Sequence, residues 1–188
     1  MSEKTPVVFF DRDGTLMEEV HYCNDPADVR VIAGAAEGLR ALREAGWARV
    51  IITNQSGIPR GRISLVQYEA VHDELVRQLG GEIDGTYFSP DLPDSGSRRR
   101  KPGIGMVEEA VRDLGLDRKR AYFVGDKAVD VECGHAAGMP SILVRTGQGR
   151  NVEAGGADYV AADVGEAIEW ILRREGTKGV PSENRVSP

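Results

Sequence analysis

The chain has 188 residues, of which 40% are hydrophobic and 29% are charged, and its formal net charge at neutral pH is −6. These values are typical of one globular domain with a sizeable core, and the acidic balance argues against a general nucleic-acid binder. No apolar run approaches the roughly 20 residues that a membrane helix needs, so a membrane span is not expected.

The two cysteines, Cys23 and Cys133, lie far apart in the sequence and form no Cys-x-x-Cys pair. Reduced thiols of this kind are typical of cytoplasmic proteins. The first residues show neither the basic segment nor the long apolar stretch of a signal peptide. We therefore expect a cytoplasmic, monomeric protein with no nucleic-acid or membrane partner.

Short apolar runs rich in β-branched residues alternate along the chain with segments whose apolar residues recur at helical spacing. Ser64 is a candidate N-cap, and glycines such as Gly46 and Gly115 follow the helical segments as stop signals. In chain order, the predicted elements are strand 7–10, helix 34–45, strand 47–53, helix 65–79, strand 83–88, helix 104–114, strand 121–124, helix 128–137, strand 141–144 and helix 164–173.

This alternation predicts an α/β fold with a mostly parallel sheet and helices on both faces. We expect a single domain over residues 1–174 and a disordered tail over residues 175–188, where apolar residues are scarce. No stretch is long enough for a separate cap domain. The substrate would therefore be covered by the loops at residues 17–32 and 89–103.

The most informative motif is Asp11-Arg12-Asp13-Gly14-Thr15, directly after the apolar run that ends at Phe10. A buried strand ending in Asp-x-Asp brings two carboxylates to the edge of the sheet where open α/β folds bind ligands. Two like charges this close are costly unless a cation or phosphate chemistry uses them. The motif predicts Mg²⁺-dependent phosphoryl transfer in which Asp11 attacks phosphorus and Asp13 acts as general acid and then base.

Three further motifs follow predicted strands or open a predicted helix. Thr53 begins Thr-Asn-Gln-Ser-Gly, where a hydroxyl and backbone N–H groups can hold phosphoryl oxygens. Lys101, in Arg-Lys-Pro, can neutralise charge on a transferring phosphoryl group. Asp126, in Gly-Asp-Lys, can complete a hard oxygen site for Mg²⁺. The same residue types also suit solvated turns and basic loops, so each motif alone is weak.

Asp130 allows two interpretations that the sequence does not separate. It lies one helical turn after Asp126 and could hydrogen-bond the shell of a metal ion. It could equally be an acidic residue that the dipole of the following helix favours.

Taken together, Asp-x-Asp-Gly-Thr, the strand-end Thr, Lys-Pro and Gly-Asp resemble the haloacid dehalogenase-like (HAD) superfamily from about residue 7 to residue 172. The fuller strings, including Thr53 to Gly61 and Leu143-Val144-Arg145-Thr146-Gly147, are similar to the D-glycero-D-manno-heptose 1,7-bisphosphate phosphatases and the related histidinol-phosphatases. The resemblance implies a Rossmann-like sheet and a magnesium-dependent phosphatase acting on a small phosphorylated molecule.

The resemblance also implies residue roles. Asp11 would be the nucleophile and Asp13 the general acid and base, with Thr53 and Lys101 stabilising the phosphoryl group. Mg²⁺ would bind Asp11, the backbone oxygen of Asp13, and Asp126. The residues expected to contact the rest of the substrate are Glu19, Val20, His21, Tyr22, Asn54, Gln55, Ser56, Arg100 and Lys127.

The chain departs from the family at two loops. Many relatives hold a structural zinc before Lys-Pro with Cys-x-His and Cys-x-Cys, but the matching positions here are Ser89, Asp91, Ser97 and Arg99. None of these is a convincing zinc ligand, so we expect no structural zinc. One hypothesis is that Asp91 pairs with Arg98 or Arg99 instead; the alternative is that these charges are unpaired and solvated.

The second departure is His21, which stands before Tyr22 where relatives usually have glycine. This difference does not affect the expected reaction, but it means that the resemblance alone does not determine the substrate. The leading candidate is a heptose bisphosphate, whose second phosphate Arg100 and Lys127 could bind. Histidinol phosphate is the alternative, because its amine would prefer acids such as Glu18 and Glu19. A catalytically silent sugar-phosphate binding protein is a third, although it should lack Asp11 or Asp13.

Overall fold

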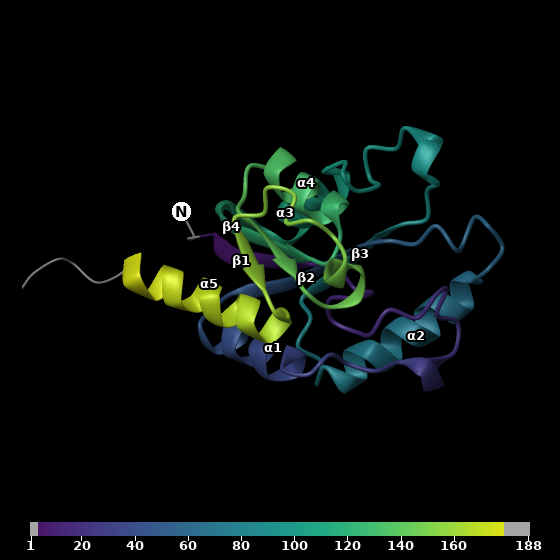
Figure 1. Cartoon of the computed structure of the whole chain (residues 1–188), viewed down its shortest axis with the longest axis horizontal. Helices are drawn as coiled ribbons and strands as arrows, with labels where there is room; N and C mark the ends of the chain where they lie inside the picture. Colours follow the sequence, from purple (N-terminus) through teal and green to yellow (C-terminus); the bar gives the residue numbers. More distant parts are fainter. Residues whose placement is uncertain (1–3, 179–188) are drawn as a thin grey trace, which may run out of the picture.

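The computed structural model describes residues 4–178, which form one six-stranded sheet with helices on both faces (Figure 1). All five strand pairings are parallel, in the order β3-β2-β1-β4-β5-β6. The strands are β1 (Thr5–Phe10), β2 (Ala48–Asn54), β3 (Gly85–Ser89), β4 (Leu116–Gly125), β5 (Ser141–Val144) and β6 (Tyr159–Ala161).

The helices divide into two layers that bury alternate residues of the central strands. Val8 and Phe10 of β1 pack with one layer, whereas Val7 and Phe9 pack with the other, as the two-residue period of a strand requires. The first layer contains α1 (Ala35–Glu44), α2 (Leu65–Gln78) and α5 (Val164–Lys178), and the second contains α3 (Gly105–Leu114) and α4 (Ala128–Ala136).

The start of α2 illustrates how local sequence sets an element boundary. The Ser64 hydroxyl accepts a hydrogen bond from the Gln67 backbone N–H at 3.1 Å, and the Gln67 side chain accepts one from the Ser64 N–H at 2.9 Å. This reciprocal capping box satisfies two N–H groups that have no partner inside the helix. The predicted N-cap at Ser64 is therefore confirmed.

The order of the strands reverses at β1. The chain builds β2 and β3 on one side of β1 and then crosses to place β4 on the other side. Such a reversal opens a crevice at the carboxyl ends of the two central strands, where open α/β sheets bind ligands. Asp11 follows β1 and Asp126 follows β4, so the fold brings the two predicted metal-binding carboxylates to this crevice.

The predicted fold class is confirmed, and the main differences from the sequence prediction are the start of β4, the end of α5 and one missed strand. β4 begins at Leu116 rather than at residue 121, and the strand β6 was missed because its apolar run, Tyr159 to Ala161, is only three residues long. α5 continues to Lys178, where the sequence predicted a disordered tail from residue 175. The Tyr122 hydroxyl donates to the Glu175 carboxylate at 2.5 Å and ties this last turn to β4. Residues 179–188 of the predicted tail lie outside the described part of the chain.

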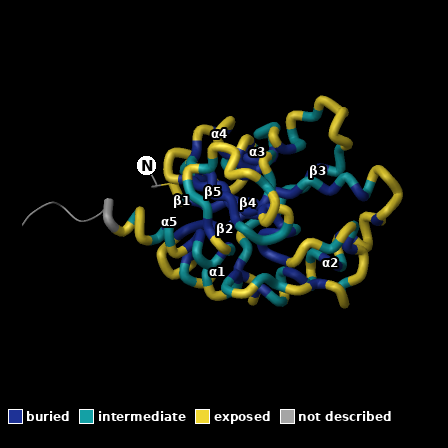
Figure 2. The backbone as a smooth tube through the Cα atoms, viewed as in Figure 1, coloured by how far each residue is buried: buried dark blue, intermediate teal, exposed yellow. Residues whose placement is uncertain are grey.

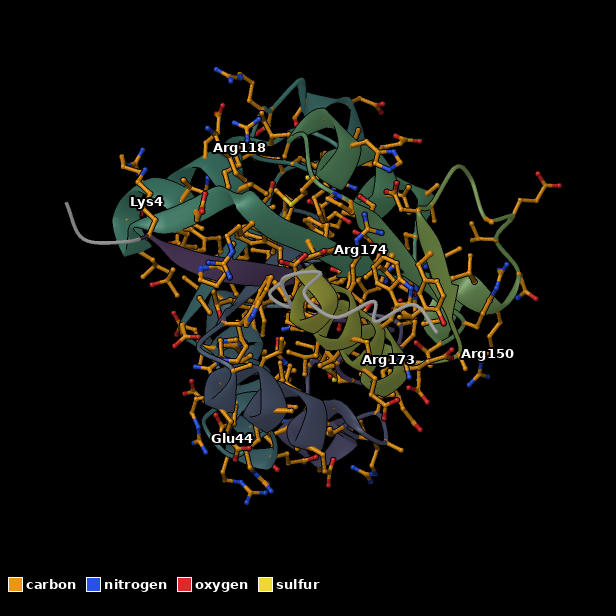
Figure 3. All side chains as sticks on the ribbon, turned by 90° about the vertical axis from the view of Figure 1, so that its left-hand side faces the viewer. Lys4, Glu44, Arg118, Arg150, Arg173 and Arg174 are labelled. Carbon is orange, nitrogen blue, oxygen red and sulfur yellow. The ribbon has the colours of Figure 1, made fainter. Side chains whose placement is uncertain are left out.

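The burial pattern follows the layers. Buried backbone runs through the strands and the inner helix faces, and exposed backbone marks the loops and outer faces (Figure 2). Figure 3 views the side on which the chain enters β1, where charged side chains such as Lys4, Glu44 and Arg118 project outward. Among residues 4–178, no helix combines the length and apolar character that crossing a bilayer would require.

Candidate active site

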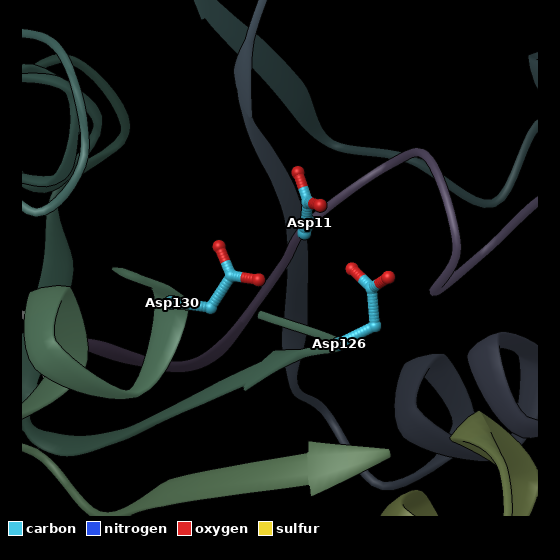
Figure 4. Close-up of side chains that lie close together, drawn as sticks. All are labelled: Asp11, Asp126 and Asp130. Atoms are coloured by element: carbon cyan, nitrogen blue, oxygen red, sulfur yellow. The ribbon is translucent and has the colours of Figure 1, made fainter. Parts of the chain in front are cut away.

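Three buried aspartates meet at the carboxyl edge of the sheet (Figure 4). Asp11 follows β1, Asp126 follows β4 and Asp130 lies in the first turn of α4. One carboxylate oxygen from each lies within 4.8 Å of the others. Such crowding of like charges in a dry site is unfavourable without cations, so the surrounding basic groups decide what this cluster can do.

The backbone around the aspartates requires glycine. The Asp11 N–H donates to the Val124 carbonyl at 2.9 Å and extends the β1–β4 ladder into the site. Gly14 and Gly147 have φ of +87° and +50°, and a Cβ on either would lie 2.2 or 2.3 Å from Asp126 Oδ2. Only residues without a side chain permit this approach to the Asp126 carboxylate.

Lys101 is the buried cation of the cluster. Its ammonium lies 2.7 Å from Asp11 Oδ1, 2.7 Å from Asp130 Oδ1 and 2.7 Å from the Ile52 carbonyl oxygen. Burial opposes its charged form, but the two carboxylates outweigh burial and raise its pKa. Burial likewise opposes ionisation of Asp11, yet Lys101 and Lys127 hold the pKa of Asp11 well below its ordinary value. Asp11 is thus kept as an anion with one face bound to Lys101.

The loop after β2 holds this arrangement in place. The Asn54 side chain both donates to the Lys101 carbonyl at 3.1 Å and accepts from the Lys101 N–H at 3.0 Å, which fixes the backbone that carries the ammonium. Gln55 donates from Nε2 to Thr53 Oγ1 and to Asp13 Oδ2, each at 2.9 Å. Asn54 and Gln55, which were predicted to contact the substrate, both line the cavity, and their side chains are hydrogen-bonded to neighbouring site residues.

Asp13 is held by an arginine that the sequence analysis overlooked. Arg12, 1% exposed, donates from Nε and Nη2 to the two carboxylate oxygens of Asp13, at 3.1 and 3.0 Å. With Gln55, three donors converge on this carboxylate. The sequence could have indicated this contact, because Arg12 stands between two aspartates directly after a buried strand. A buried guanidinium is stable only when an anion pairs with it.

The oxygen atoms predicted to bind Mg²⁺ surround one cation. The Lys127 ammonium lies 3.4 Å from Asp11 Oδ2, 3.4 Å from Asp126 Oδ1 and 3.2 Å from the backbone oxygen of Asp13. Asp126 Oδ1 is buried and accepts no hydrogen bond from the residues that the structure describes. Burial and the charge of Asp11 raise the pKa of Asp126 to about 7.

These observations test whether the residues fit a magnesium ion. Two carboxylates and a carbonyl form a hard oxygen set of the kind Mg²⁺ takes, and the Lys127 ammonium marks the position where positive charge is needed. Asp130 instead pairs with Lys101 and accepts the Lys127 backbone N–H at 3.0 Å. The fit therefore favours Asp11, Asp13 and Asp126 as the ligand set, with Asp130 holding Lys101 and capping α4.

The site opens into a cavity of about 300 Å³. Its lining includes the predicted substrate contacts Glu19, Val20, His21, Tyr22, Ser56, Arg100 and Lys127. The Glu19 carboxylate lies 3.2 Å from the Lys127 ammonium, so this acid is already paired with a cation. His21 packs on Tyr22 with ring centroids 4.1 Å apart.

The rim of the cavity contains an arginine that the sequence analysis left out. Arg60 donates to the Tyr22 hydroxyl at 3.2 Å and to Ser56 Oγ at 3.0 Å, joining the loops after β1 and β2. Burial and the nearby Arg60 charge lower the pKa of Arg100. Arg60 and Arg100 thus form a positive region beside the cavity, and the Gly-Ile-Pro-Arg-Gly string was the signal for Arg60.

The proposed pairing of Asp91 with Arg98 or Arg99 is wrong. Arg98 pairs with Glu108 at 3.2 Å and Arg99 with Glu109 at 2.8 Å, because both arginines face α3. Asp91 is hydrogen-bonded by the Ser89 hydroxyl at 2.9 Å, and hydrogen bonds from Ser97 and Ser89 lower the pKa of Asp91. The two ends of the loop are joined by hydroxyl–carboxylate hydrogen bonds rather than by an ion pair.

The loop after β5 contacts the site through Thr146 and Gln148. The sequence indicated part of this loop as a family-like string but gave it no function. The Thr146 hydroxyl donates to the Gly14 carbonyl at 2.6 Å, and the Gln148 N–H donates to Asp126 Oδ2 at 2.8 Å. These contacts hold the Asp126 carboxylate and the turn of Asp-x-Asp-Gly. The Arg-Thr-Gly string was the sequence signal, but spacing alone could not show that it returns to Asp126.

This fold, with its acidic cluster, buried lysine and glycine turn at the switch point, is that of the HAD-like hydrolases. The HAD-hydrolase-like family model matches residues 98–167. A crystal structure of D,D-heptose 1,7-bisphosphate phosphatase from B. bronchiseptica, complexed with magnesium and phosphate, superposes with a TM-score of 0.80 at 28% identity. That similarity covers 90% of this chain and 99% of the other.

Curated relatives narrow the class. The D-glycero-D-manno-heptose-1,7-bisphosphate 7-phosphatase of Thermosynechococcus vestitus is 39% identical over 88% of this chain and 95% of its own length. The D-glycero-beta-D-manno-heptose-1,7-bisphosphate 7-phosphatase of Yersinia pestis is 35% identical over 92% of each chain. The chain belongs to the D-glycero-D-manno-heptose-1,7-bisphosphate 7-phosphatase family, and it is a HAD phosphatase.

Proposed function

We propose that this enzyme removes the 7-phosphate of D-glycero-D-manno-heptose 1,7-bisphosphate, releasing the heptose 1-phosphate and inorganic phosphate, with Mg²⁺ as its cofactor. The observation that carries the proposal is the buried Asp11 carboxylate, which is held by Lys101 and lines the same cavity as Asp13. The activities named for the relatives support the choice of substrate.

In the proposed reaction, an Asp11 oxygen attacks the phosphorus of the 7-phosphate. The bond between phosphorus and the sugar oxygen breaks, and that oxygen takes a proton from Asp13. Asp13 then takes a proton from water, whose oxygen attacks the aspartyl-phosphate and frees Asp11 and phosphate. Lys101 and Thr53 stabilise charge on the phosphoryl oxygens, which is the main requirement of such transfers.

A magnesium ion held by Asp11, Asp126 and the Asp13 backbone oxygen would neutralise charge on the phosphoryl group. Lys127 would then be free to face Glu19 and the substrate. Arg100, which also lines the cavity, supplies a positive charge that could bind the second phosphate of a bisphosphate. This use of cations favours a bisphosphate over histidinol phosphate, since Glu19 is already paired with Lys127.

We also propose that the chain acts as a single-domain, cytoplasmic monomer. Both helix layers pack on one sheet, which supports a single domain. The two cysteines are free and buried, as in proteins of a reducing compartment. Sedimentation of the purified protein tests the monomer, and a stable dimer would overturn it.

The test is kcat/KM with Mg²⁺ for the α- and β-anomers of the heptose bisphosphate, histidinol phosphate and common sugar monophosphates. We expect one heptose bisphosphate anomer to be hydrolysed fastest, with activity lost on chelation of the metal. Asp11→Asn should lower turnover by about 10⁴-fold or more, because it removes the nucleophile.

The matched control is Asp158→Asn, which alters an aspartate bound to the Ser141 N–H outside the site and should retain full turnover. A preference for histidinol phosphate would overturn the substrate assignment alone. Turnover that survives Asp11→Asn would overturn the mechanism.

A further inference from the structure

Arg12 is the largest fully buried side chain of the described chain, and it is one of the residues that line the cavity. Taking a guanidinium out of water is costly, and the cost is offset only where good geometry satisfies its charge. Its Nε and Nη2 atoms bind the Asp13 carboxylate as a two-pronged fork, while Nη1 is buried without a partner among the described residues. The ion pair with Asp13 is therefore the main interaction that offsets the cost of burying the Arg12 guanidinium.

The guanidinium is itself fixed from behind. Arg12 Cζ lies 5.1 Å from the centroid of the Tyr68 ring, in cation–π geometry. The Tyr68 ring packs in turn on Phe88, with centroids 4.5 Å apart. Tyr68 of α2 thus holds Arg12, and Phe88 of β3 holds Tyr68 in turn, so that the fork on Asp13 is supported from behind.

Among Asp11, Asp13 and Asp126, the Asp13 side chain is the most exposed and so needs the most help to hold one orientation. Its side chain is 14% exposed, whereas those of Asp11 and Asp126 are 4% and 0% exposed. It lies beyond the end of β1, just before the turn at Gly14, so the β1 ladder does not orient it. Proton transfer to a leaving oxygen demands hydrogen-bond geometry at the moment the bond breaks, and a misplacement of about 1 Å can cost about 10²-fold in rate.

We propose that Arg12 is a positioning residue for the general acid. It rests on the proposed function in that Asp13 must protonate the leaving oxygen. Arg12 holds both carboxylate oxygens in one orientation at the cavity wall. It exchanges no proton and touches no reacting atom: the phosphorus–oxygen bond breaks, the oxygen takes its proton from Asp13, and Arg12 keeps that carboxyl group in reach.

A positioning role and a merely structural role predict different substrate dependence. A sugar phosphate releases a poor leaving group that needs a proton, whereas 2,4-dinitrophenyl phosphate releases a stable anion that needs none. The ratio kcat/KM reports the steps up to formation of the aspartyl-phosphate, and kcat also includes its hydrolysis. Only kcat/KM for the alkyl substrate should therefore depend strongly on the orientation of Asp13.

The experiment compares Arg12→Met and Arg12→Lys with the unmodified enzyme, using 2,4-dinitrophenyl phosphate and the sugar phosphate that it hydrolyses fastest. We expect Arg12→Met to lower kcat/KM for the sugar phosphate by about 10²-fold, and for the dinitrophenyl ester by less than about threefold. Arg12→Lys keeps the charge and loses the fork. It should therefore lower kcat/KM for the sugar phosphate by a smaller factor than Arg12→Met, again with little effect on the dinitrophenyl ester.

The matched control is Arg49→Met. Arg49 is also buried and binds Asp84 through Nε and Nη2, at 2.9 and 2.7 Å, near the opposite end of β2. Its loss should lower stability and leave both kcat/KM values unchanged in the folded protein. Equal losses on the two substrates for Arg12→Met, or no loss on either, would overturn the proposal. If Arg12→Met does not fold, Arg12→Lys decides by the same criterion.

A further variant separates this inference from the proposed function. Asp13→Asn removes the acid itself and should show the same selective loss, larger in size. If Asp13→Asn is selective and the Arg12 variants are not, only the positioning role fails. If Asp13→Asn affects both substrates equally, the assignment of Asp13 as general acid fails, and the proposed mechanism fails with it.

Discussion

Lys101 and Arg100 are neighbours in the sequence, yet they belong to two regions that hold charge in opposite ways. Lys101 is 2% exposed and has three oxygen partners within 2.7 Å, which belong to β1, β2 and α4 or follow them directly. Arg100 lies at the rim, and one hydrogen bond of 2.9 Å joins its guanidinium to the Asp91 carbonyl. The positions of charged groups at the sheet edge are fixed by several contacts each, whereas the position of Arg100 at the rim depends on a single hydrogen bond.

This difference suggests separate roles: the sheet edge carries out the reaction, and the rim selects the substrate. Every charged group at the sheet edge contacts at least one other, so a change there affects several partners at once. A change at the rim affects one loop contact and leaves the reacting groups in place. We therefore expect variants of the edge to abolish turnover and variants of the rim to change which ester is preferred.

Among the variants that compare the sheet edge with the rim, Lys101→Met should have the largest effect. The variant leaves Asp11 and Asp130 buried without their cation, which should lower the free energy of unfolding by about 3–5 kcal/mol. Loss of the positive charge beside the phosphoryl group should lower kcat by about 10³-fold. Denaturant unfolding and steady-state kinetics measure the two effects. An active, fully stable Lys101→Met protein would show that the edge is not determined as the contacts indicate.

Gly14 and Gly61 offer a second comparison of the same two regions. Both have positive φ, +87° and +65°, but a Cβ at Gly14 would meet Asp126 Oδ2 whereas one at Gly61 would meet nothing within 4 Å. Gly61→Ala should cost only the backbone strain of about 1–2 kcal/mol. Gly14→Ala should cost more and also weaken Mg²⁺ binding by about tenfold or more, because it displaces a metal-binding carboxylate.

Thermal unfolding and calorimetric titration with Mg²⁺ distinguish the two glycine variants. Equal Mg²⁺ affinity in Gly14→Ala and the unmodified protein would contradict the proposed metal site. A large loss of affinity in Gly61→Ala would show that the rim and the edge are coupled.

The two regions also differed in how far the sequence could predict them. The fold class and the meeting of Asp11, Asp126 and Lys101 followed from strand-end motifs, because parallel strands deliver their carboxyl ends to one edge. Arg12, Gln55 and Gln148 could not be placed in that way. Their partners are set by side-chain direction and by loops that return to the site, neither of which has a sequence period.

The loop between β3 and α3 shows the same limit more sharply. The departure of four positions from the zinc-binding pattern stays a sequence prediction, and the pairing inferred for Asp91 was wrong. Opposite charges close in sequence suggested an ion pair with Arg98 or Arg99. The helix α3 offered Glu108 and Glu109 as competing partners, and only the packing of the loop against that helix decides between them.

Arg100→Met should have a smaller effect than any change at the sheet edge. If the rim binds the second phosphate, removing this cation should lower kcat/KM for the bisphosphate by about tenfold, the value of one charge-assisted hydrogen bond. Sugar monophosphates should be hydrolysed as before, because the reacting groups are untouched. Equal losses for both classes of substrate would place Arg100 with the reaction rather than with substrate selection.

The smallest effect concerns the pH dependence of loop order around Asp91. Hydrogen bonds from Ser97 and Ser89 lower its pKa, so the carboxylate form is favoured in the folded loop. The stabilisation is fully present above the ordinary value of 3.8 and is lost as the pH falls through the lowered pKa. Hydrogen exchange of residues 89–100 should therefore be the same from neutral pH down to about pH 5, after correction for intrinsic rates, and should accelerate only below the ordinary pKa.

Asp91→Asn supplies the control for this measurement, because an amide can still accept hydrogen bonds but does not titrate. Its loop should exchange slightly faster at neutral pH, and the acid-dependent change should disappear while exchange in the core strands is unaltered. Since the Asp91 carbonyl, not its carboxylate, accepts the hydrogen bond from Arg100, kcat/KM should change by less than about threefold. A loss as large as that of Arg100→Met would mean that the hydrogen-bonded loop, rather than the arginine alone, selects the substrate.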